Sequence, residues 1–297
     1  MPDMKSTLSE VCLPTETDYI GIYLTNKCFL SCPYCITNQA NAFINARQFR
    51  ELSPEDWIAG LNRLVLPPDI PVTFEGGEPF LYKGIWSLLE NVRHKIDILT
   101  ALPSQVTPGK FKELQTLDWN QRPSPYPTIR VSYHHGQNDY HQLIERIREL
   151  QEVVSIGLYH IEHPDYPDLT EEIREEAKAA GIEFRTKAFL GDWHGKLYGQ
   201  FKYLDACVGQ PTRPHVLCKN SVFPVAPNGD IYRCHSDLYS GYVRGVIGQI
   251  MDPNLKMEFL YRDCDHYGTC SPCDAKIKTN HLQQFGYTSI DVKFDEA

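Results

Sequence analysis

Short apolar segments alternate with amphipathic segments between residues 19 and 189, and this alternation constrains the fold more than any other feature of the chain. Apolar or alternating patterns predict six strands, at Tyr19–Thr25, Val72–Glu75, Ile96–Ala101, Ile129–His134, Val154–Ile161 and Glu183–Phe189. Helical patterns predict five helices between them, at Pro54–Val65, Gly84–His94, Pro108–Leu117, Tyr140–Gln151 and Thr170–Ala180. Strands joined by helices run parallel, so the predicted fold class is α/β, with a parallel sheet that is open or partly closed into a barrel.

The alternation also predicts which side chains face the inner surface of the sheet. In Ile129–His134, the Ile, Val and Tyr side chains suit burial under helices, and the polar side chains then face inward. With the same treatment of Glu183–Phe189, the inward polar residues are Arg130, Ser132, His134, Arg185 and Lys187. Polar groups inside a barrel are costly unless they bind something, so we interpret the interior as a ligand cavity. A strand phase shifted by one residue would instead leave these groups solvated.

The composition of the 297 residues excludes several classes of protein. A net charge of −9 argues against nucleic acid or an anionic membrane as a partner. No apolar run approaches the roughly 18 residues of a membrane span, and the first residues lack the pattern of a secretory signal. We therefore expect a cytoplasmic protein. In such a chain, ten cysteines at short spacings favour metal or redox chemistry over disulfides.

Cys28, Cys32 and Cys35 form a C-x3-C-x2-C motif directly after the first predicted strand. Three thiolates in one loop can hold three irons of a 4Fe-4S cluster and leave the fourth iron open to an exogenous ligand. A zinc knuckle or buried free thiols are the alternatives. At these residues the sequence resembles the radical S-adenosylmethionine (SAM) superfamily, in which an aromatic residue precedes the third cysteine, as Tyr34 does here. The resemblance implies a partial (β/α)6 TIM-like barrel and a cluster that binds SAM, with Tyr34 among the cofactor-binding residues.

A glycine-rich segment with the sequence GGEP follows the second predicted strand. In the superfamily such a segment contacts the methionine part of SAM. The resemblance therefore implies that Gly76, Gly77 and Glu78 bind SAM, the glutamate region receiving its ammonium group. Glycines permit this close approach because they lack a Cβ, although a glycine pair by itself is equally typical of a strand-end turn.

The contacts to the rest of SAM are less defined by the sequence. Many relatives have a Thr-Asn-Gly turn after the third strand, and residues 99–103 have no such turn. From strand phase, Ser132 and Arg185 are the candidates for binding the ribose and the carboxylate of SAM. For an inward arginine, a salt bridge within the barrel is the alternative.

A second group of cysteines follows residue 215. Cys218 and Cys234 flank the turn signal Pro227–Asp230 in a C-x10-G-x4-C pattern, which predicts that both lie at the base of a hairpin. This pattern resembles the start of the SPASM and shorter twitch domains, which carry auxiliary clusters in radical SAM enzymes. The resemblance implies one further 4Fe-4S cluster, with the ligands Cys218, Cys234, Cys270 and Cys273. Structural zinc is the alternative.

Three cysteines have no place in these motifs. Cys264 could replace one of the four ligands, lie near the substrate or be a buried free thiol. Cys207 and Cys12 match no pattern, and we interpret them as core or surface thiols.

The predicted domain organisation has five parts. They are an N-terminal extension at 1–18, a radical SAM partial barrel at 19–190, a linker at 191–215, a small cysteine-rich SPASM-like or twitch-like domain at 216–280, and a tail at 281–297. The tail contains one possible strand, Ser289–Phe294.

The resemblance implies an enzyme in which the reduced first cluster donates an electron to SAM. SAM then cleaves to methionine and a 5′-deoxyadenosyl radical, which abstracts a substrate hydrogen. An auxiliary cluster could accept an electron from the substrate, so that a small molecule or a peptide is oxidised or modified. About 18 residues precede the first strand, which favours a small molecule. His134, at the carboxyl end of a strand, is the best single candidate for a catalytic side chain.

A low-potential electron donor such as ferredoxin or flavodoxin is expected by analogy with the superfamily. Two other classes of protein stay open. One is an iron-sulfur electron carrier that never cleaves SAM, and the other is a zinc-stabilised binding scaffold. Neither explains the GGEP segment, and SAM turnover separates both from the enzyme.

Overall fold

A computed structural model describes residues 8–35, 49–121, 123–198, 210–270 and 289–294. Cys207 and Cys273 lie outside the described residues, so the predictions for them are not addressed by the structure. Within the described part of the chain, no helix has the length and apolar character needed to cross a membrane.

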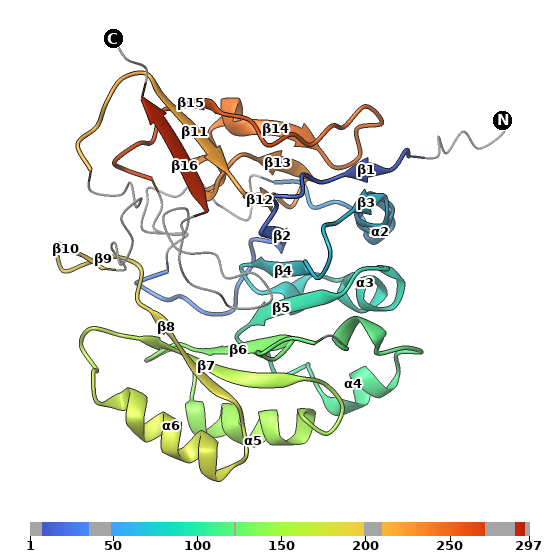
Figure 1. The fold of residues 1–297 in the computed structure, drawn as a ribbon. Helices are drawn as coiled ribbons and strands as arrows, with labels where there is room; N and C mark the ends of the chain where they lie inside the picture. The colour runs from blue at the N-terminus through green and yellow to red at the C-terminus, as the bar shows by residue number, and fades with distance from the viewer. Residues whose placement is uncertain (1–7, 36–48, 122, 199–209, 271–288, 295–297) are drawn as a thin grey trace.

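Nine strands form one open sheet in the order β14-β13-β12-β2-β4-β5-β6-β7-β8 (Figure 1). The six neighbouring strands from β2 to β8 are the predicted parallel set, each within two residues of its predicted bounds. They are β2 (Tyr19–Thr25), β4 (Val72–Gly76), β5 (Ile96–Thr100), β6 (Ile129–Tyr133), β7 (Ile156–Glu162) and β8 (Phe184–Ala188). The prediction of an α/β fold with a mainly parallel sheet is therefore confirmed.

Helices cover one face of this sheet. They are α2 (Pro54–Asn62), α3 (Ile85–Asn91), α4 (Pro108–Lys112), α5 (Tyr140–Leu150) and α6 (Leu169–Ala179), with the 3-10 turns η1 (Pro79–Leu81) and η2 (Asp118–Asn120). Ile129 and Val131 of β6 belong to the same buried apolar cluster as Ile147 of α5. The alternate residues of β6 therefore point to the opposite, inner face, as the sequence predicts.

Three helices end at least three residues earlier than predicted, and α3 among them stops at Asn91 instead of His94. Helix α2 stops at Asn62, and the next residues form β3 (Leu64–Val65), which pairs with β1 (Val11–Cys12). The predicted N-terminal extension thus contributes a strand, because Val11 and Leu13 are apolar and become buried against this segment. Helix α4 stops at Lys112, where the amide of Leu114 donates to the carbonyl of Phe111 at 3.1 Å in a tighter turn.

The C-terminal region both extends the main sheet and forms a sheet of its own. Strand β12 (Val222–Val225) pairs in parallel with β2 and leads through the predicted hairpin to β13 (Asp230–Tyr232), which pairs with β14 (Val246–Gln249). A three-stranded sheet has the order β15-β11-β16, with β11 at Val216–Asn220, β15 at Arg262–Cys264 and β16 at Ile290–Phe294. All four residues of β12 are buried, and pairing with β2 supplies the cover that such an apolar strand needs.

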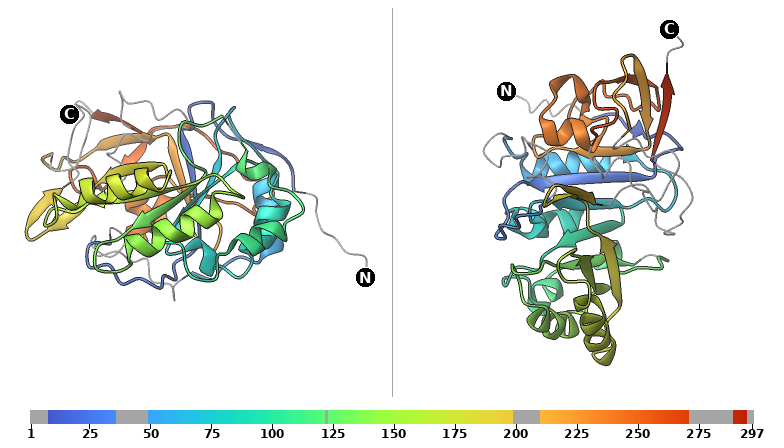
Figure 2. Two further views of the ribbon diagram at one scale, coloured as in Figure 1. Left: turned by 90° about the horizontal axis from the view of Figure 1, so that it is seen from below. Right: turned by 90° about the vertical axis from the view of Figure 1, so that its left-hand side faces the viewer.

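The remaining described elements are short. In the predicted linker, β9 (Gly191–Trp193) and β10 (Lys196–Tyr198) form an antiparallel pair. Helix α7 (His235–Ser240) and the turn η3 (Val243–Gly245) lie between β13 and β14. The C-terminal strands and the helices α5 and α6 lie at opposite ends of the main sheet (Figure 1 and Figure 2).

Candidate active site

The loops that carry the predicted site residues meet at the carboxyl edge of the parallel sheet. The cysteine loop follows β2, the GGEP segment follows β4, and His134 follows β6. Carboxyl ends of parallel strands share one edge, which is where ligands bind in open α/β sheets. The order of the strands therefore brings residues together that are more than 100 positions apart in the sequence.

The two glycines of the GGEP segment lie directly against the start of the cysteine loop. The amide of Gly77 donates to the carbonyl of Thr25 at 3.0 Å, and the amide of Glu78 donates to the carbonyl of Lys27 at 2.8 Å. A Cβ on Gly77 would lie 2.3 Å from the Lys27 carbonyl oxygen. Gly76 has a φ of 125°, which side chains disfavour. The glycines are thus needed by the protein's own backbone, because they seat the segment that leads into Cys28.

Glu78 links this segment to the end of β5. Its side chain is buried and accepts hydrogen bonds from the amide of Phe80 at 3.0 Å, the hydroxyl of Thr100 at 2.8 Å and the amide of Ala101 at 2.7 Å. Burial raises the pKa of this carboxyl to about 7, although these three bonds act in the opposite direction. The structure therefore shows Glu78 as an anchor between two loops of the site.

The cysteine loop presents its three thiols in different environments. Cys28 is exposed, Cys35 is half-buried and Cys32 is buried. The amide of Cys35 donates to the carbonyl of Cys32 at 3.1 Å, and the amide of Ser31 donates to the side chain of Gln137 at 2.9 Å. Burial raises the pKa of the Cys32 thiol to about 12, and the neighbouring sulfurs of Cys35 and Cys28 add to the shift. The three sulfurs are therefore close enough to influence one another electrostatically.

Tyr34 holds this loop against the ends of β6, β7 and β8. Its ring is 6 % exposed and stacks on the ring of His134, with 6.2 Å between centroids. The same ring contacts His163 at 4.9 Å and Phe189 at 5.5 Å, and its hydroxyl donates to the carbonyl of His135 at 3.4 Å. The structure thus brings together Tyr34 and His134, both of which are site residues in the prediction.

The inner face of the sheet carries buried polar atoms without a hydrogen-bond partner. Within the described residues they include the Asn26 amide, Arg130 Nε, His134 Nδ1 and the Tyr159 hydroxyl. Leaving such atoms unpaired costs free energy, and a polar ligand or ordered water that bonded to those on this face would remove the cost. Burial, together with the Lys187 ammonium, lowers the pKa of His134 to about 4, so its imidazole is neutral at pH 7.

The inward arginine and lysine side chains have different surroundings. Arg130 pairs with the buried Asp97, with 2.9 Å between Nη2 and Oδ2, which is the barrel salt bridge that was the alternative to ligand binding. The Lys187 ammonium lies 5.1 Å from the ring centroid of Tyr159. Arg185 donates to Glu183 at 2.7 Å and to the carbonyl of Pro125.

These partners place Arg185 near the amino ends of β6 and β8, at the edge opposite His134. Ser132 is half-buried on the inner face, two residues before His134. Sequence analysis did not single out Thr73 and Glu75, whose side chains meet the buried Tyr19 hydroxyl. Their alternation with the buried Phe74 is the signal that could have identified them.

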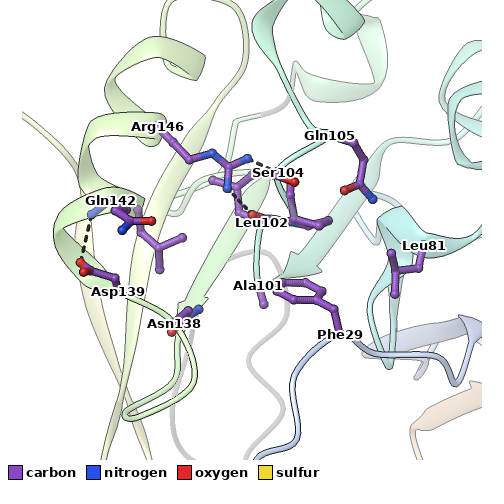
Figure 3. Close-up of a pocket in the computed structure, with 12 residues that line it drawn as sticks. Phe29, Leu81, Ala101, Leu102, Ser104, Gln105, Asn138, Asp139, Gln142 and Arg146 are labelled. Atoms are coloured by element: carbon purple, nitrogen blue, oxygen red, sulfur yellow. Dashed lines mark hydrogen bonds between the residues drawn. The ribbon is translucent and has the colours of Figure 1, made fainter.

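A cavity of about 350 Å³ adjoins the cysteine loop (Figure 3). It lies between the chain that follows β5 and the start of α5, and Phe29 of the cysteine loop is part of its lining. Arg146 fixes one wall by donating to the carbonyls of Leu102, Pro103 and Val106, the last two at 2.9 and 3.1 Å. The volume of this cavity is at the lower end of the range for small-molecule sites.

The turn that the sequence predicts between Cys218 and Cys234 is present, and it joins β12 to β13. Gly229 sits in the turn with a φ of 87°, and its amide donates to the carbonyl of Ala226 at 2.8 Å. Cys218 lies in β11, Cys234 immediately precedes α7, and Cys270 is buried. The structure in addition brings Cys264 next to Cys218, whereas Cys273 is outside the described residues.

The donor set of the first loop suits a cluster. Each cysteine of a 4Fe-4S centre binds a different iron, whereas a zinc site needs all its sulfurs about 2.3 Å from one ion. Within the part of the chain that the structure describes, no three His, Cys, Asp or Glu residues are arranged to hold a single metal ion. The three cysteines of this loop, whose start is hydrogen-bonded to Gly77 and Glu78, could supply three of the thiolates of such a cluster.

Comparisons with known proteins address the first half of the chain most directly. Two curated relatives, the GTP 3',8-cyclases of Clostridium perfringens strain SM101 / Type A and strain 13 / Type A, are each 32% identical over 77 residues, which is 26% of this chain and 23% of theirs. The chain thus matches about a quarter of the length of these relatives. The structure of Streptococcus suis SuiB bound to S-adenosylmethionine is similar with a TM-score of 0.41 and 16% identity, covering 82% of this chain and 63% of SuiB.

The structure of histidine-tagged anSMEcpe with bound AdoMet is similar with a TM-score of 0.49 and 12% identity, covering 89% of this chain and 88% of anSMEcpe. The family model described as the radical SAM superfamily matches residues 22–157. This range contains the cysteine loop, the GGEP segment and the inner residues of β6. The match covers slightly less than half of the chain, so residues 22–157 are similar to the radical SAM superfamily.

Proposed function

We propose that the protein is a radical SAM enzyme whose first 4Fe-4S cluster is held by Cys28, Cys32 and Cys35. The observation that carries this proposal is the pair of backbone hydrogen bonds from Gly77 and Glu78 to the start of the cysteine loop. These bonds place a three-thiol loop and a glycine-rich, close-approach segment side by side at the carboxyl edge of a parallel sheet. Together with SAM, the reduced cluster supplies a 5′-deoxyadenosyl radical that abstracts a hydrogen atom from the substrate.

The chain's own residues bind, orient and shield the reactants. Gly76, Gly77 and Glu78 form the wall against which the methionine part of SAM binds, and Tyr34 closes the site toward β8. Ser132 contributes a further SAM contact. Lys187 suits the SAM carboxylate better than Arg185, because it lies nearer the carboxyl edge on the same strand.

His134 is the candidate for proton transfer to or from the substrate. Its imidazole is neutral at pH 7, and its Nδ1 is buried without a hydrogen-bond partner. Nδ1 can therefore accept a hydrogen bond or a proton from a substrate that enters beside Tyr34.

The substrate class is a polar small molecule or a peptide. The inner face supports this assignment because Asn26, His134 and Tyr159 offer buried polar atoms that await partners. The curated cyclases match over only a quarter of their length, so GTP enters as one compound in a substrate screen. We expect the protein to act in the cytoplasm with a low-potential donor such as ferredoxin or flavodoxin, without nucleic acid or membrane partners.

The second cysteine group holds one auxiliary 4Fe-4S cluster in this proposal, within a SPASM-like or twitch-like region. Its ligands come from Cys218, Cys234, Cys270 and Cys273, and its role is to accept an electron when the substrate is oxidised. The hairpin of β12 and β13, which lies between Cys218 in β11 and Cys234 at the start of α7, supports the first two ligands. The enzyme would then be an oxidoreductase or a maturase.

The test is anaerobic reconstitution followed by an assay for 5′-deoxyadenosine after dithionite and SAM are added. Wild-type protein is compared with the Cys28→Ala, Cys32→Ala, Cys35→Ala triple variant, and Cys12→Ala is the control because Cys12 is exposed on β1. We expect 5′-deoxyadenosine from the wild type and the control, and none from the triple variant. Iron without SAM cleavage in the wild type would instead support an electron carrier.

A further inference from the structure

Cys264 lies in the strand that pairs with the strand of Cys218. In the antiparallel pair of β11 and β15, Val216 faces Cys264 and Cys218 faces Arg262. Directly paired residues in such a ladder share one face, and so do residues two apart along a strand. Cys218 and Cys264 are therefore diagonal neighbours on the same face of the small sheet, a relation that the C-x5-C-x2-C spacing does not reveal.

The side chains make use of this placement. The side chains of Cys218 and Cys264 interact with each other through their sulfurs. The guanidinium of Arg233 interacts electrostatically with the sulfurs of both Cys234 and Cys264. The sulfur of Cys234 is itself fixed, since it accepts a hydrogen bond from the amide of Asp237 at 3.4 Å. Cys218 and Cys264 thus lie together, and Arg233 links them electrostatically to Cys234 at the start of α7.

The basic side chains of Arg233 and His266 lie near these thiols, and the buried carboxylate of Asp237 binds both basic side chains. Asp237 is fully buried and binds Arg233, with 3.2 Å between Nη2 and Oδ1. The same carboxylate lies 2.9 Å from Nε2 of His266, two residues after Cys264. Thiolate ligands make an iron-sulfur or zinc centre negative, and nearby basic groups stabilise that charge. The arrangement is therefore a thiol set with a charge-compensating surround.

We infer that Cys264 is a ligand of the second metal centre, together with Cys218 and Cys234. Arg233 and His266 are positioning residues that compensate the charge of the centre, and Asp237 fixes both of them. This inference rests on the proposed function only in requiring that the second cysteine group binds metal. The inference changes the ligand set, because Cys218, Cys234 and Cys264 fill three positions of a four-ligand centre. The buried Cys270 is the cysteine of the described residues that can fill the fourth position.

The first test uses the Cys28→Ala, Cys32→Ala, Cys35→Ala protein, in which the first cluster cannot form. Iron, sulfide and zinc are measured after anaerobic reconstitution, with Cys264→Ala added in one sample and Cys12→Ala in another. We expect about four irons per chain in the parent, as one 4Fe-4S centre requires, at least a twofold loss with Cys264→Ala, and no loss with Cys12→Ala. Full iron and an unchanged electron paramagnetic resonance (EPR) spectrum in the Cys264→Ala protein would overturn the inference.

The metal identified separates this inference from the proposed function. Zinc in the parent, lost on Cys264→Ala, supports Cys264 as a ligand and contradicts the auxiliary iron-sulfur cluster. Retained iron in the Cys264→Ala protein contradicts the ligand role and leaves the auxiliary cluster in place. A parent that binds no metal at all contradicts both.

A second test needs no substitution at Cys264 and so does not depend on how that variant folds. The full chain is alkylated with iodoacetamide before and after reconstitution, and each cysteine is quantified by mass spectrometry. Cys264 is half-buried and Cys12 is exposed, so both can react in the metal-free protein. We expect Cys264 and Cys218 to lose about 90 % of their labelling on loading, which is about a tenfold protection. Equal labelling of Cys264 before and after loading, in protein shown to contain the second centre, would overturn the inference.

Discussion

Gly77→Ala tests whether the glycine pair is required by the protein's own backbone. The new Cβ would lie 2.3 Å from the carbonyl oxygen of Lys27 and 2.6 Å from that of Asn26, and neither backbone atom can rotate away. The segment after β4 must therefore separate from the cysteine loop by about 0.7 Å to reach the 3.0 Å limit of real contacts. That shift stretches the hydrogen bonds of 3.0 and 2.8 Å that Gly77 and Glu78 donate.

Losing these two bonds costs about 1–3 kcal/mol, and overpacking adds about 1–3 kcal/mol. We expect the metal-free variant to lose about 2–6 kcal/mol of unfolding free energy in urea and to bind less iron in the first centre. The matched control is Gly109→Ala in α4, where the new Cβ meets nothing closer than 3.7 Å. If the Gly77→Ala and Gly109→Ala proteins unfold within about 0.5 kcal/mol of each other, the seating role of the glycines is refuted.

Three further substitutions test other parts of the site. Burial raises the pKa of Glu78 to about 7 from 4.5, so the folded protein binds the proton more tightly than the unfolded chain. The protonation of Glu78 therefore stabilises the fold fully below about pH 4.5, and this stabilisation is lost as the pH rises through 7. In urea titrations, the unfolding free energy of Glu78→Gln relative to the wild type should rise by up to about 3 kcal/mol from pH 5 to pH 8. The same difference in unfolding free energy at both pH values would contradict the assignment. Arg130→Met leaves the buried Asp97 carboxylate without its ion-pair partner, so we expect a loss of about 3–5 kcal/mol of unfolding free energy. Adding Asp97→Asn should partly restore the unfolding free energy in a double-mutant cycle, and additive losses would show that the pair is not coupled. Tyr34→Phe keeps the ring contacts and removes only the 3.4 Å hydrogen bond to His135, whereas Tyr34→Ala removes the ring itself. Iron analysis should show that the Phe variant retains the iron of the first centre and that the Ala variant loses it. Equal iron in both variants would argue against the role of the ring.

The central sheet could be predicted from the sequence because its signal is local. Strands such as Ile129–Tyr133 alternate apolar and polar residues, and each lies between a turn and an amphipathic helix. The pairing of β12 with β2 could not be predicted in this way. It joins residues about 200 positions apart, and the four buried residues of β12 do not show which strand they pair with.

The same distinction applies to the site. Alternation identified the face of the sheet on which Arg130 and Arg185 lie, and the structure agrees. It did not give the position along the strand, so Arg185 is near the amino edge while His134 is at the carboxyl edge. The contact of Cys218 with Cys264 was equally out of reach, since it depends on the register between β11 and β15.

The most direct test of the account is whether SAM binds the first cluster itself. The Cys218→Ala, Cys234→Ala protein isolates that cluster, and its EPR spectrum is recorded after reduction with dithionite, with and without SAM. An iron that lacks a protein ligand changes its coordination when SAM binds, so the account predicts a shift of the g values on adding SAM and no shift on adding adenosine. A reduced cluster with the same spectrum in the presence and absence of SAM would contradict it.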